Sequence, residues 1–429
     1  MSDAQVRRAR NAVYVAFISS GFAFASWASR IPQVRAQLHV SPGVLGLILL
    51  CAAIGSAVAI PLAGLVIVRI GEAVTVTATS LIAAAGLAVV AVGYRHGIPP
   101  VAAGLFLFGF GSGSWDVAMN VQGAAVERRV GRAIMPKFHA GWSIGTVAGA
   151  GLGTALVAWH VPVTAHLLAV AVAVGVAAPL AARSFLPAGA TAPEPAASTA
   201  GAAGAARAVG AAGGAGGSGA TRAGADSAPR PRHPLAAWTE PRTLAIGVFV
   251  LCVTVIEGVG NDWLSLGVID GYHTAAAIGT ATLAGFLAAM TAGRWFGPRF
   301  IDRYGRVPVL RAGAAVALSG LLLVGFSGYL EVAMAGAVLM GLGTSLGFPV
   351  GMSAAADDPR YAAGRVSATA SIGYGAFLAG PPVIGLIADH VGVLHALTVT
   401  GVLLVVALFA SQATAPVRPA AAREGGRVA

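Results

Sequence analysis

Residues 98–126 have the sequence IPPVAAGLFLFGFGSGSWDVAMNVQGAAV, which contains a single charged side chain, that of Asp116. An apolar stretch of this length can cross a hydrocarbon core about 30 Å thick as a helix. Similar stretches recur along the 429-residue chain, of which 57% is hydrophobic and 10% charged. A soluble domain carries about 25% charged residues, so most of this surface cannot face water. The sequence therefore predicts an all-α polytopic membrane protein.

Twelve such spans can be marked, and Gly and Pro are common inside them, as packed membrane helices tolerate. The spans are residues 11–30, 43–68, 74–93, 98–122, 139–159, 162–182, 243–268, 275–297, 307–327, 329–353, 364–388 and 392–412. Between the sixth and the seventh, residues 187–237 are mainly Ala, Gly, Pro, Ser and Arg, a composition typical of a flexible linker. The expected organisation is a six-helix bundle (1–186), a cytoplasmic linker (187–237), a second six-helix bundle (238–414) and a cytoplasmic tail (415–429).

The basic residues indicate which loops are cytoplasmic. If both termini share one face, all but three of the 27 Lys and Arg residues lie on that face, the exceptions being Arg30, Arg35 and Arg95. Because basic residues beside membrane helices stay in the cytoplasm, both termini are predicted to be cytoplasmic. The net charge of +11 is then a topology signal scattered over short loops, and not the single basic surface of a nucleic-acid-binding protein.

Four short motifs of the first half recur in the second half. SWAS (26–29) pairs with DWLS (262–265), VRIGE (68–72) with DRYGR (302–306), GFGSGS (109–114) with GLGTSL (341–346), and SIG (143–145) with SIG (371–373). The four pairs occur in the same order in both halves, with offsets that fall only from 236 to 228 residues. We interpret the chain as a duplicated six-helix unit, an arrangement found in secondary transporters.

Twelve helices in two halves, a long central loop and a repeated loop motif resemble the major facilitator superfamily of transporters. The signature of that family between the second and third helices of a half is G-x-x-x-D-R-x-G-R, of which the second half keeps Asp302, Arg303, Gly305 and Arg306. The first half keeps Gly64, Arg69 and Gly71, while the acid and the base are replaced by Val68 and Glu72. The resemblance implies that these loops latch the cytoplasmic ends of helices as the halves rock, with the latch of the first half weakened.

Helix 4 is similar to the fucose-permease branch of sugar–proton symporters, in which an acid is followed four residues later by Asn, as Asp116 is by Asn120. The segment MPKFHAGWSIG (135–145) is similar to uncharacterised bacterial transporters of that branch. Those symporters usually carry a second acid in helix 1, where SWASRIPQ (26–33) has none. The resemblance implies a monomeric, proton-coupled transporter of a small polar solute, with a sugar as one candidate, in a bacterial plasma membrane.

Asp116 is the main candidate for the proton-coupling site. An ionised carboxylate at membrane depth costs roughly 2.5–3.5 kcal/mol on insertion scales, so it should face the bundle interior with a partner or a proton. Asn120 lies on the same helical face and could hydrogen-bond the carboxyl group or a substrate hydroxyl. The alternative is that Asp116 only holds a neighbouring helix, but intramembrane acids are functional by default.

Helix 7 contains further polar residues, in the segment IEGVGNDWLSLG (256–267). Glu257 is near the midpoint of the span, with Asn261 four residues later as a candidate substrate ligand. Helices 1 and 7 line the cavity in the superfamily, so Glu257 is either a second coupling acid or part of an ion pair that closes a gate. Asp262 should lie about 7.5 Å further toward the outside, where we expect an outer-gate or structural residue.

Other residues are candidates with a structural alternative. Four tryptophans could stack on a sugar ring, anchor the chain at the membrane interface or simply pack: Trp27, Trp115, Trp142 and Trp263. Arg30 could pair with an acid, bind an anionic substrate or lie exposed at the membrane surface. His139, at the cytoplasmic start of helix 5, could titrate at a gate or lie in solvent. A stripe of small residues along helix 5 predicts close helix packing: Gly141, Gly145, Gly149 and Gly153.

Several function classes are disfavoured. A phosphate loop needs Lys followed by Ser or Thr, whereas Phe138 follows Lys137, the only lysine. No Cys/His cluster has metal-ligand spacing and no soluble segment could hold a catalytic domain, so we expect no enzyme, no metal and no cofactor. Proton-driven efflux of a drug or metabolite is the alternative transport function, and an aromatic cavity lining would favour it. A non-transporting membrane sensor would need a folded output module, which the linker composition does not provide.

Overall fold

The computed structural model describes residues 2–131, 134–187, 234–358 and 361–416, and its regular elements in these ranges are all helical. The first half consists of α1 (Asp3–Ala28), α2 (Ile31–Leu38), α3 (Pro42–Gly93), α4 (Ile98–Val130), α5 (Met135–Ala158) and α6 (Val163–Ala182). The second half consists of η1 (Pro234–Thr239), α8 (Pro241–Tyr272), α9 (Ala276–Tyr304), α10 (Arg306–Phe326), α11 (Leu330–Thr344), α12 (Gly347–Ala355), α13 (Ala362–Val391), α14 (Val393–Val399), α15 (Gly401–Ala410) and η2 (Ser411–Thr414). Most of the predicted linker and tail lies outside the described residues.

Eleven helical segments of the described ranges are long and apolar enough to cross a membrane. One of them, α3, has 52 residues and is broken at Gly71 (φ 77°, ψ 165°), so it supplies two spans. The pairs α11–α12 and α14–α15 supply one span each. With α3 counted twice, the eleven segments account for the twelve predicted spans, and the prediction of an all-α polytopic protein is confirmed.

The breaks between helices support the duplication. Gly305, between α9 and α10, has nearly the same backbone angles (φ 82°, ψ 166°) as Gly71 in α3, 234 residues earlier. His39 and His273 end α2 and α8 in the left-handed region with φ 51° in both, again 234 residues apart. Only glycine adopts the first of these conformations without strain. The loop motifs therefore take equivalent conformations in the two halves.

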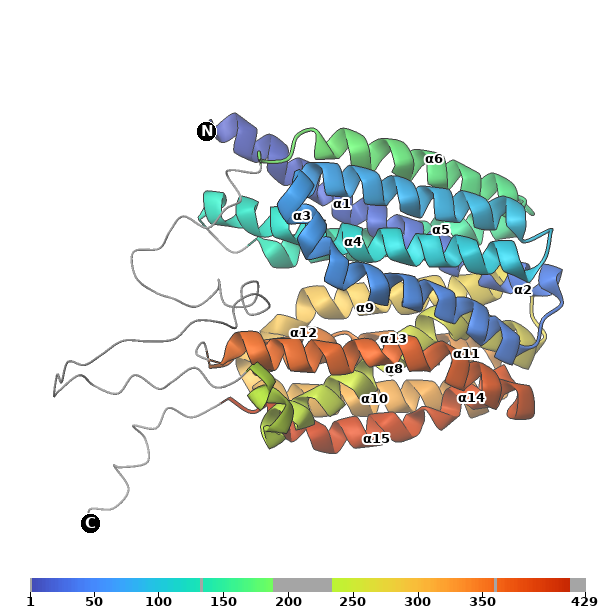
Figure 1. Cartoon of the computed structure of the whole chain (residues 1–429). Coiled ribbons are helices and arrows are strands. Elements are labelled where there is room, and N and C mark those ends of the chain that lie inside the picture. Colours follow the sequence, from blue (N-terminus) through green and yellow to red (C-terminus); the bar gives the residue numbers. More distant parts are fainter. Residues whose placement is uncertain (1, 132–133, 188–233, 359–360, 417–429) are drawn as a thin grey trace, which may run out of the picture.

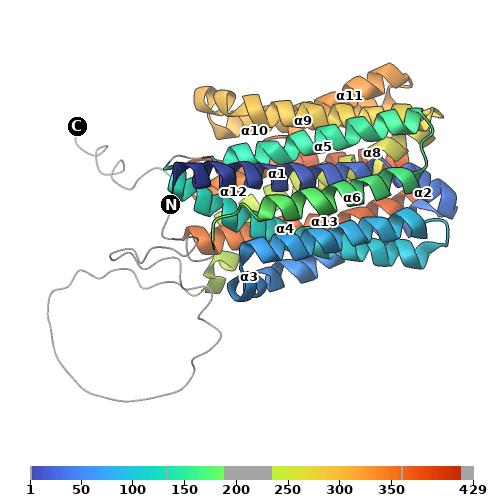
Figure 2. The same ribbon diagram turned by 90° about the horizontal axis from the view of Figure 1, so that it is seen from above.

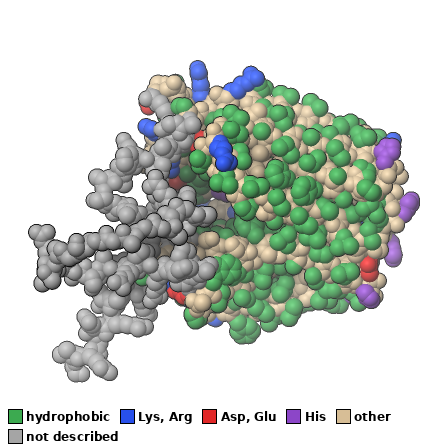
Figure 3. Space-filling model, in the orientation of Figure 1, with side chains coloured by type: hydrophobic (Ala, Val, Ile, Leu, Met, Phe, Trp, Pro, Cys, Tyr) green, Lys and Arg blue, Asp and Glu red, His purple; other side chains and the backbone are tan. Residues whose placement is uncertain are grey.

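The two halves lie side by side along their length (Figures 1 and 2). Helix α1 begins and α15 ends at one end of the bundle, which we call the inner end following the predicted topology, while α2 lies at the opposite, outer end. Figure 3 shows hydrophobic side chains over the visible face between the ends, with most of the visible Lys and Arg toward the inner end and the visible His at the outer end. This apolar belt is where lipid tails would lie.

The close packing predicted for the glycine stripe of α5 is found against α1. A Cβ atom on Gly145 would lie 2.9 Å from the backbone nitrogen of Phe22 and closer still to the carbonyl oxygen of Ile18. A Cβ atom on Gly149 would lie 3.1 Å from the backbone nitrogen of Ser26. The absence of side chains at these positions lets the two helix backbones approach each other.

Replacement of Gly145 by alanine should therefore destabilise the protein, by about 1–3 kcal/mol, because the methyl group would force α1 and α5 apart. Gly151→Ala is the matched control, since nothing lies within 4 Å of a Cβ atom at that position of the same helix. The control should be neutral or stabilising by up to about 1 kcal/mol, through helix propensity. Thermal unfolding of the two detergent-solubilised variants measures the difference, and equal unfolding temperatures would contradict close packing of α5 on α1.

Candidate functional site

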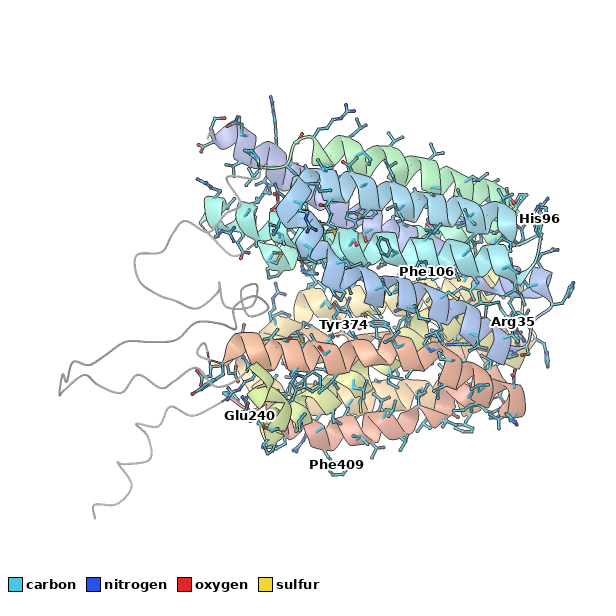
Figure 4. All side chains as sticks on the ribbon, in the orientation of Figure 1. Arg35, His96, Phe106, Glu240, Tyr374 and Phe409 are labelled. Carbon is cyan, nitrogen blue, oxygen red and sulfur yellow. The ribbon has the colours of Figure 1, made fainter. Side chains whose placement is uncertain are left out.

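A cavity of about 340 Å³ lies between the two halves and is lined by residues of both. The first half contributes side chains from α1, α3, α4 and α5, and the second half from α8 and α13. Figure 4 shows one of them, Tyr374 of α13, between the halves, with Arg35 and His96 at the outer end and Glu240 at the inner end. Among the described residues, Asp116 and Asp262 are the charged side chains of the lining.

Asp116 reaches the cavity from α4 and is partly buried. The Asn120 side chain, one turn later, donates to the Asp116 carbonyl oxygen (2.8 Å) and to its Oδ1 (3.2 Å). Asn120 is not part of the lining, so its amide holds the carboxyl group rather than facing a solute. The i and i+4 spacing thus orients the carboxyl group toward the space between the halves.

Asn261 and Asp262 of α8 line the same cavity from the other half. Asn261 is 6% exposed, and its Oδ1 has no hydrogen-bond partner among the described residues. Asp262 likewise has no hydrogen bond or ion pair in the described part of the chain. Asp262, predicted as an outer-gate or structural residue, therefore lines the central cavity.

Glu257 forms an ion pair and does not line the cavity. Its Oε1 accepts a hydrogen bond from Arg294 of α9 at 2.7 Å, and Arg294 Nε also donates to the carbonyl oxygen of Ser345 (3.3 Å). Sequence reasoning missed Arg294, although it is the only charged residue in the predicted span 275–297, just as Asp116 is in residues 98–126. The contact favours the ion-pair interpretation of Glu257.

The predicted tryptophans divide into two groups. Trp27 and Trp142 line the cavity, whereas Trp115 and Trp263 are buried in the helix packing, 1% and 0% exposed. The lining also contains four aromatic residues that sequence reasoning did not single out: Phe24, Phe108, Tyr374 and Phe377. An aromatic residue in an apolar span has no distinguishing sequence signal, because packing against lipid or protein is its ordinary use.

Arg30 is neither exposed nor in the cavity. It is 2% exposed inside the first half, and its Nε donates to Nδ1 of His166 (2.8 Å) on α6, itself 2% exposed. The expectation of a membrane-surface arginine is therefore wrong: the turn at Ser29 and Arg30, between α1 and α2, points the side chain inward against α6. Pairing with an acid is not found among the described residues either.

The loop motif of the second half is tied to the end of α12. Arg306 donates to Asp357 Oδ1 (2.6 Å) and to Ser353 Oγ (3.2 Å). Arg242, at the start of α8, binds the other oxygen of Asp357 at 2.9 Å. The remaining motif residues are exposed, namely Asp302, Arg303, Gly305 and, in the first half, Arg69, while Gly71 is partly buried. His139 is also exposed, at the start of α5.

Polar contacts join the two halves at the outer end. Arg35 of α2 forms an ion pair of 2.5 Å with Asp270 of α8. Asp389, near the end of α13, accepts from the backbone nitrogen of Gly43 (2.9 Å) and from Ser41 Oγ (3.2 Å). These contacts hold α2 and the start of α3 against the second half, so the structure is a state closed at its outer end.

Comparison with known proteins identifies the class. A model of the Major Facilitator Superfamily matches residues 13–296 and 263–427. The protein described as "Uncharacterized transporter y4wD" of Sinorhizobium fredii is 30% identical over 383 residues, covering 88% of this chain and 90% of that protein. The chain belongs to the Major Facilitator Superfamily.

Two solved structures show the same fold at low sequence identity. The nucleoside transporter NupG superposes with a TM-score of 0.69 and 13% identity, over 94% of this chain and 98% of that one. The E. coli fucose:proton symporter FucP superposes with a TM-score of 0.57 and 15% identity, over 95% and 98%. These likenesses concern the fold; the family assignment, together with the apolar helices, makes the chain a multi-pass membrane transporter.

Proposed function

We propose that the chain is a proton-coupled secondary transporter whose small solute binds in the central cavity and is moved by alternating access. The observation that carries the proposal is Asp116: a carboxyl group in an otherwise uncharged part of α4, facing the cavity between the halves. Among the described residues its carboxyl group is hydrogen-bonded by Asn120 alone. A carboxyl group with one neutral partner at this depth is a site for a proton.

The arrangement gives Asp116 a simple part in the transport cycle. With a proton bound, the carboxyl group is neutral and costs little to shield from water; without it, the carboxylate needs water or a cation. When the halves rock, the cavity is exposed to one side of the membrane and then to the other. The proton on Asp116 can then exchange with the solution on each side in turn.

The solute is a small polar molecule, and a sugar is one candidate, since aromatic rings stack on sugar faces and the Asn261 oxygen is free to accept a hydrogen bond. Proton-driven efflux of an amphipathic drug or metabolite is the second candidate, and the aromatic residues of the lining favour it. Six aromatic side chains line the cavity: Phe24, Trp27, Phe108, Trp142, Tyr374 and Phe377. We further propose a monomer in a bacterial plasma membrane, with both termini cytoplasmic, as the distribution of basic residues predicts.

The test uses the full chain reconstituted in liposomes, with a proton gradient imposed in either direction. Labelled sugars, nucleosides and organic amines are offered one at a time. We expect at least one solute to move against its own concentration gradient, and a protonophore to abolish that movement. If solutes only equilibrate, whatever the proton gradient, proton coupling is wrong and the chain is a facilitator.

A further inference from the structure

The two carboxyl groups of the cavity have no positive charge to balance them. Asp116 comes from the first half and Asp262 from the second, and no described Arg, Lys or His lines the cavity. Two arginines elsewhere in the helix packing already have partners: Arg294 pairs with Glu257, and Arg30 donates to His166 inside the first half. A solute in this cavity therefore meets negative charge, the Asn261 amide, aromatic rings and small or apolar side chains.

The two acids are not equivalent. Asp116 is held by Asn120, whereas Asp262 has no partner among the described residues. If Asp116 takes the coupling proton, Asp262 still has to be compensated whenever it is ionised and shielded from water, because an unpaired charge in such a site is costly. A neutral solute would leave that charge uncompensated, and an anionic solute would be repelled by it. A positively charged solute would balance it.

The aromatic lining suits a cation of a particular kind. Phe24 and Trp142 of the first half have ring centroids 6.0 Å apart, and Tyr374 and Phe377 of the second half have centroids 6.3 Å apart. Faces of aromatic rings attract cations that are weakly hydrated, above all substituted ammonium groups. An inorganic cation prefers a shell of oxygen ligands, and the described residues contain no cluster of three metal-ligating side chains.

We propose that the solute of this transporter is an organic cation, an amine or a quaternary ammonium compound, and that Asp262 is the carboxylate that binds its charge. The aromatic pairs Phe24–Trp142 and Tyr374–Phe377 enclose the apolar groups around the nitrogen. This inference rests on the proposed transport function and adds the charge class of the solute.

Binding to the purified full chain in lipid nanodiscs tests the inference without any proton gradient. Each of two pairs of probes contains a cation and an analogue in which a neutral carbon replaces the charged nitrogen. The pairs are choline with 3,3-dimethylbutanol, and (3-hydroxyphenyl)trimethylammonium with 3-tert-butylphenol. Isothermal titration calorimetry should show at least one cation binding about tenfold or more tightly than its neutral analogue. Equal affinities within both pairs, or no binding of either cation, would overturn the inference.

Variants test whether the Asp262 carboxylate is responsible for the preference for the cation. Asp262→Asn should remove the preference for the cation, Asp262→Glu should keep it, and Glu331→Gln, at an exposed acid at the start of α11, should leave it unchanged. The glutamate variant keeps the test valid if the asparagine variant fails to fold. A cation preference that survives in folded Asp262→Asn would contradict the role of Asp262. Cation binding without gradient-driven transport would contradict the proposed function alone, and gradient-driven transport of a neutral solute would contradict this inference alone.

Discussion

Oxidation of a protein carrying Ser41→Cys and Asp389→Cys should stop transport completely, and reduction should restore it. Ser41 Oγ and Asp389 Oδ2 are 3.2 Å apart across the outer contact between α3 and α13, so cysteines at these positions place two thiols on facing sides of this contact, where oxidation is expected to join them. Alternating access requires the outer ends of the two halves to separate. A covalent bond between them would hold the cavity closed on that side.

The experiment is made in a background without the native thiols, Cys51 and Cys252, which are both free. Each single variant is the control, because a lone thiol cannot join the halves, and oxidation should leave its transport unchanged. Disulfide formation is followed by mass spectrometry after proteolysis. Full transport by quantitatively cross-linked protein would show that the outer contact does not open, and would contradict alternating access through this end.

Glu257→Gln should destabilise the protein by about 1–3 kcal/mol, because it leaves Arg294 in the helix packing without its carboxylate partner. The two side chains are only 14% and 25% exposed, so water compensates the loss incompletely. The reciprocal variant Arg294→Gln should be destabilised for the same reason. The double variant Glu257→Gln/Arg294→Gln should recover most of the stability, since no unpaired charge remains.

Thermal unfolding of the four proteins measures the coupling between the two side chains. Proton-driven transport by the double variant separates the two interpretations of Glu257. As one half of an ion pair, Glu257 can be lost together with Arg294 while coupling persists. A Glu257→Gln protein that is as stable as the wild type but uncoupled would instead make Glu257 a coupling acid.

The spans could be predicted from the sequence because an apolar run of about 20 residues has one stable arrangement in a bilayer. The same logic identified Asp116, since a lone carboxyl group in such a run has to face the protein interior. The glycine stripe of α5 likewise predicted close helix packing, but not that α1 is the partner helix. The spans and the repeated motif predicted a loop between residues 68 and 74, where α3 breaks at Gly71, but not the exact helix ends.

What the sequence could not predict depends on how helices are rotated and paired. Asp262 lines the cavity, although its position along α8 suggested an outer gate, and Arg30 turns inward toward His166, which is 136 residues away in the sequence. The aromatic residues Tyr374 and Phe377 resemble any others in an apolar span until the fold brings α13 to the cavity. The outer contacts of Asp389 likewise join segments that are 346 and 348 residues apart, and no local pattern indicates them.

The most direct test of the central claim is to measure proton movement and solute exchange on the same proteoliposomes, with wild type and Asp116→Asn. Asparagine has nearly the shape of the protonated carboxyl group, but its amide does not release a proton at physiological pH. We expect the variant to retain solute exchange in the absence of a gradient, while solute-dependent proton movement falls to the level of liposomes without protein. Glu331→Gln, which changes an exposed acid, should behave as the wild type in both measurements. If Asp116→Asn moves protons with the solute as the wild type does, Asp116 is not the coupling site and the proposed mechanism of coupling is wrong.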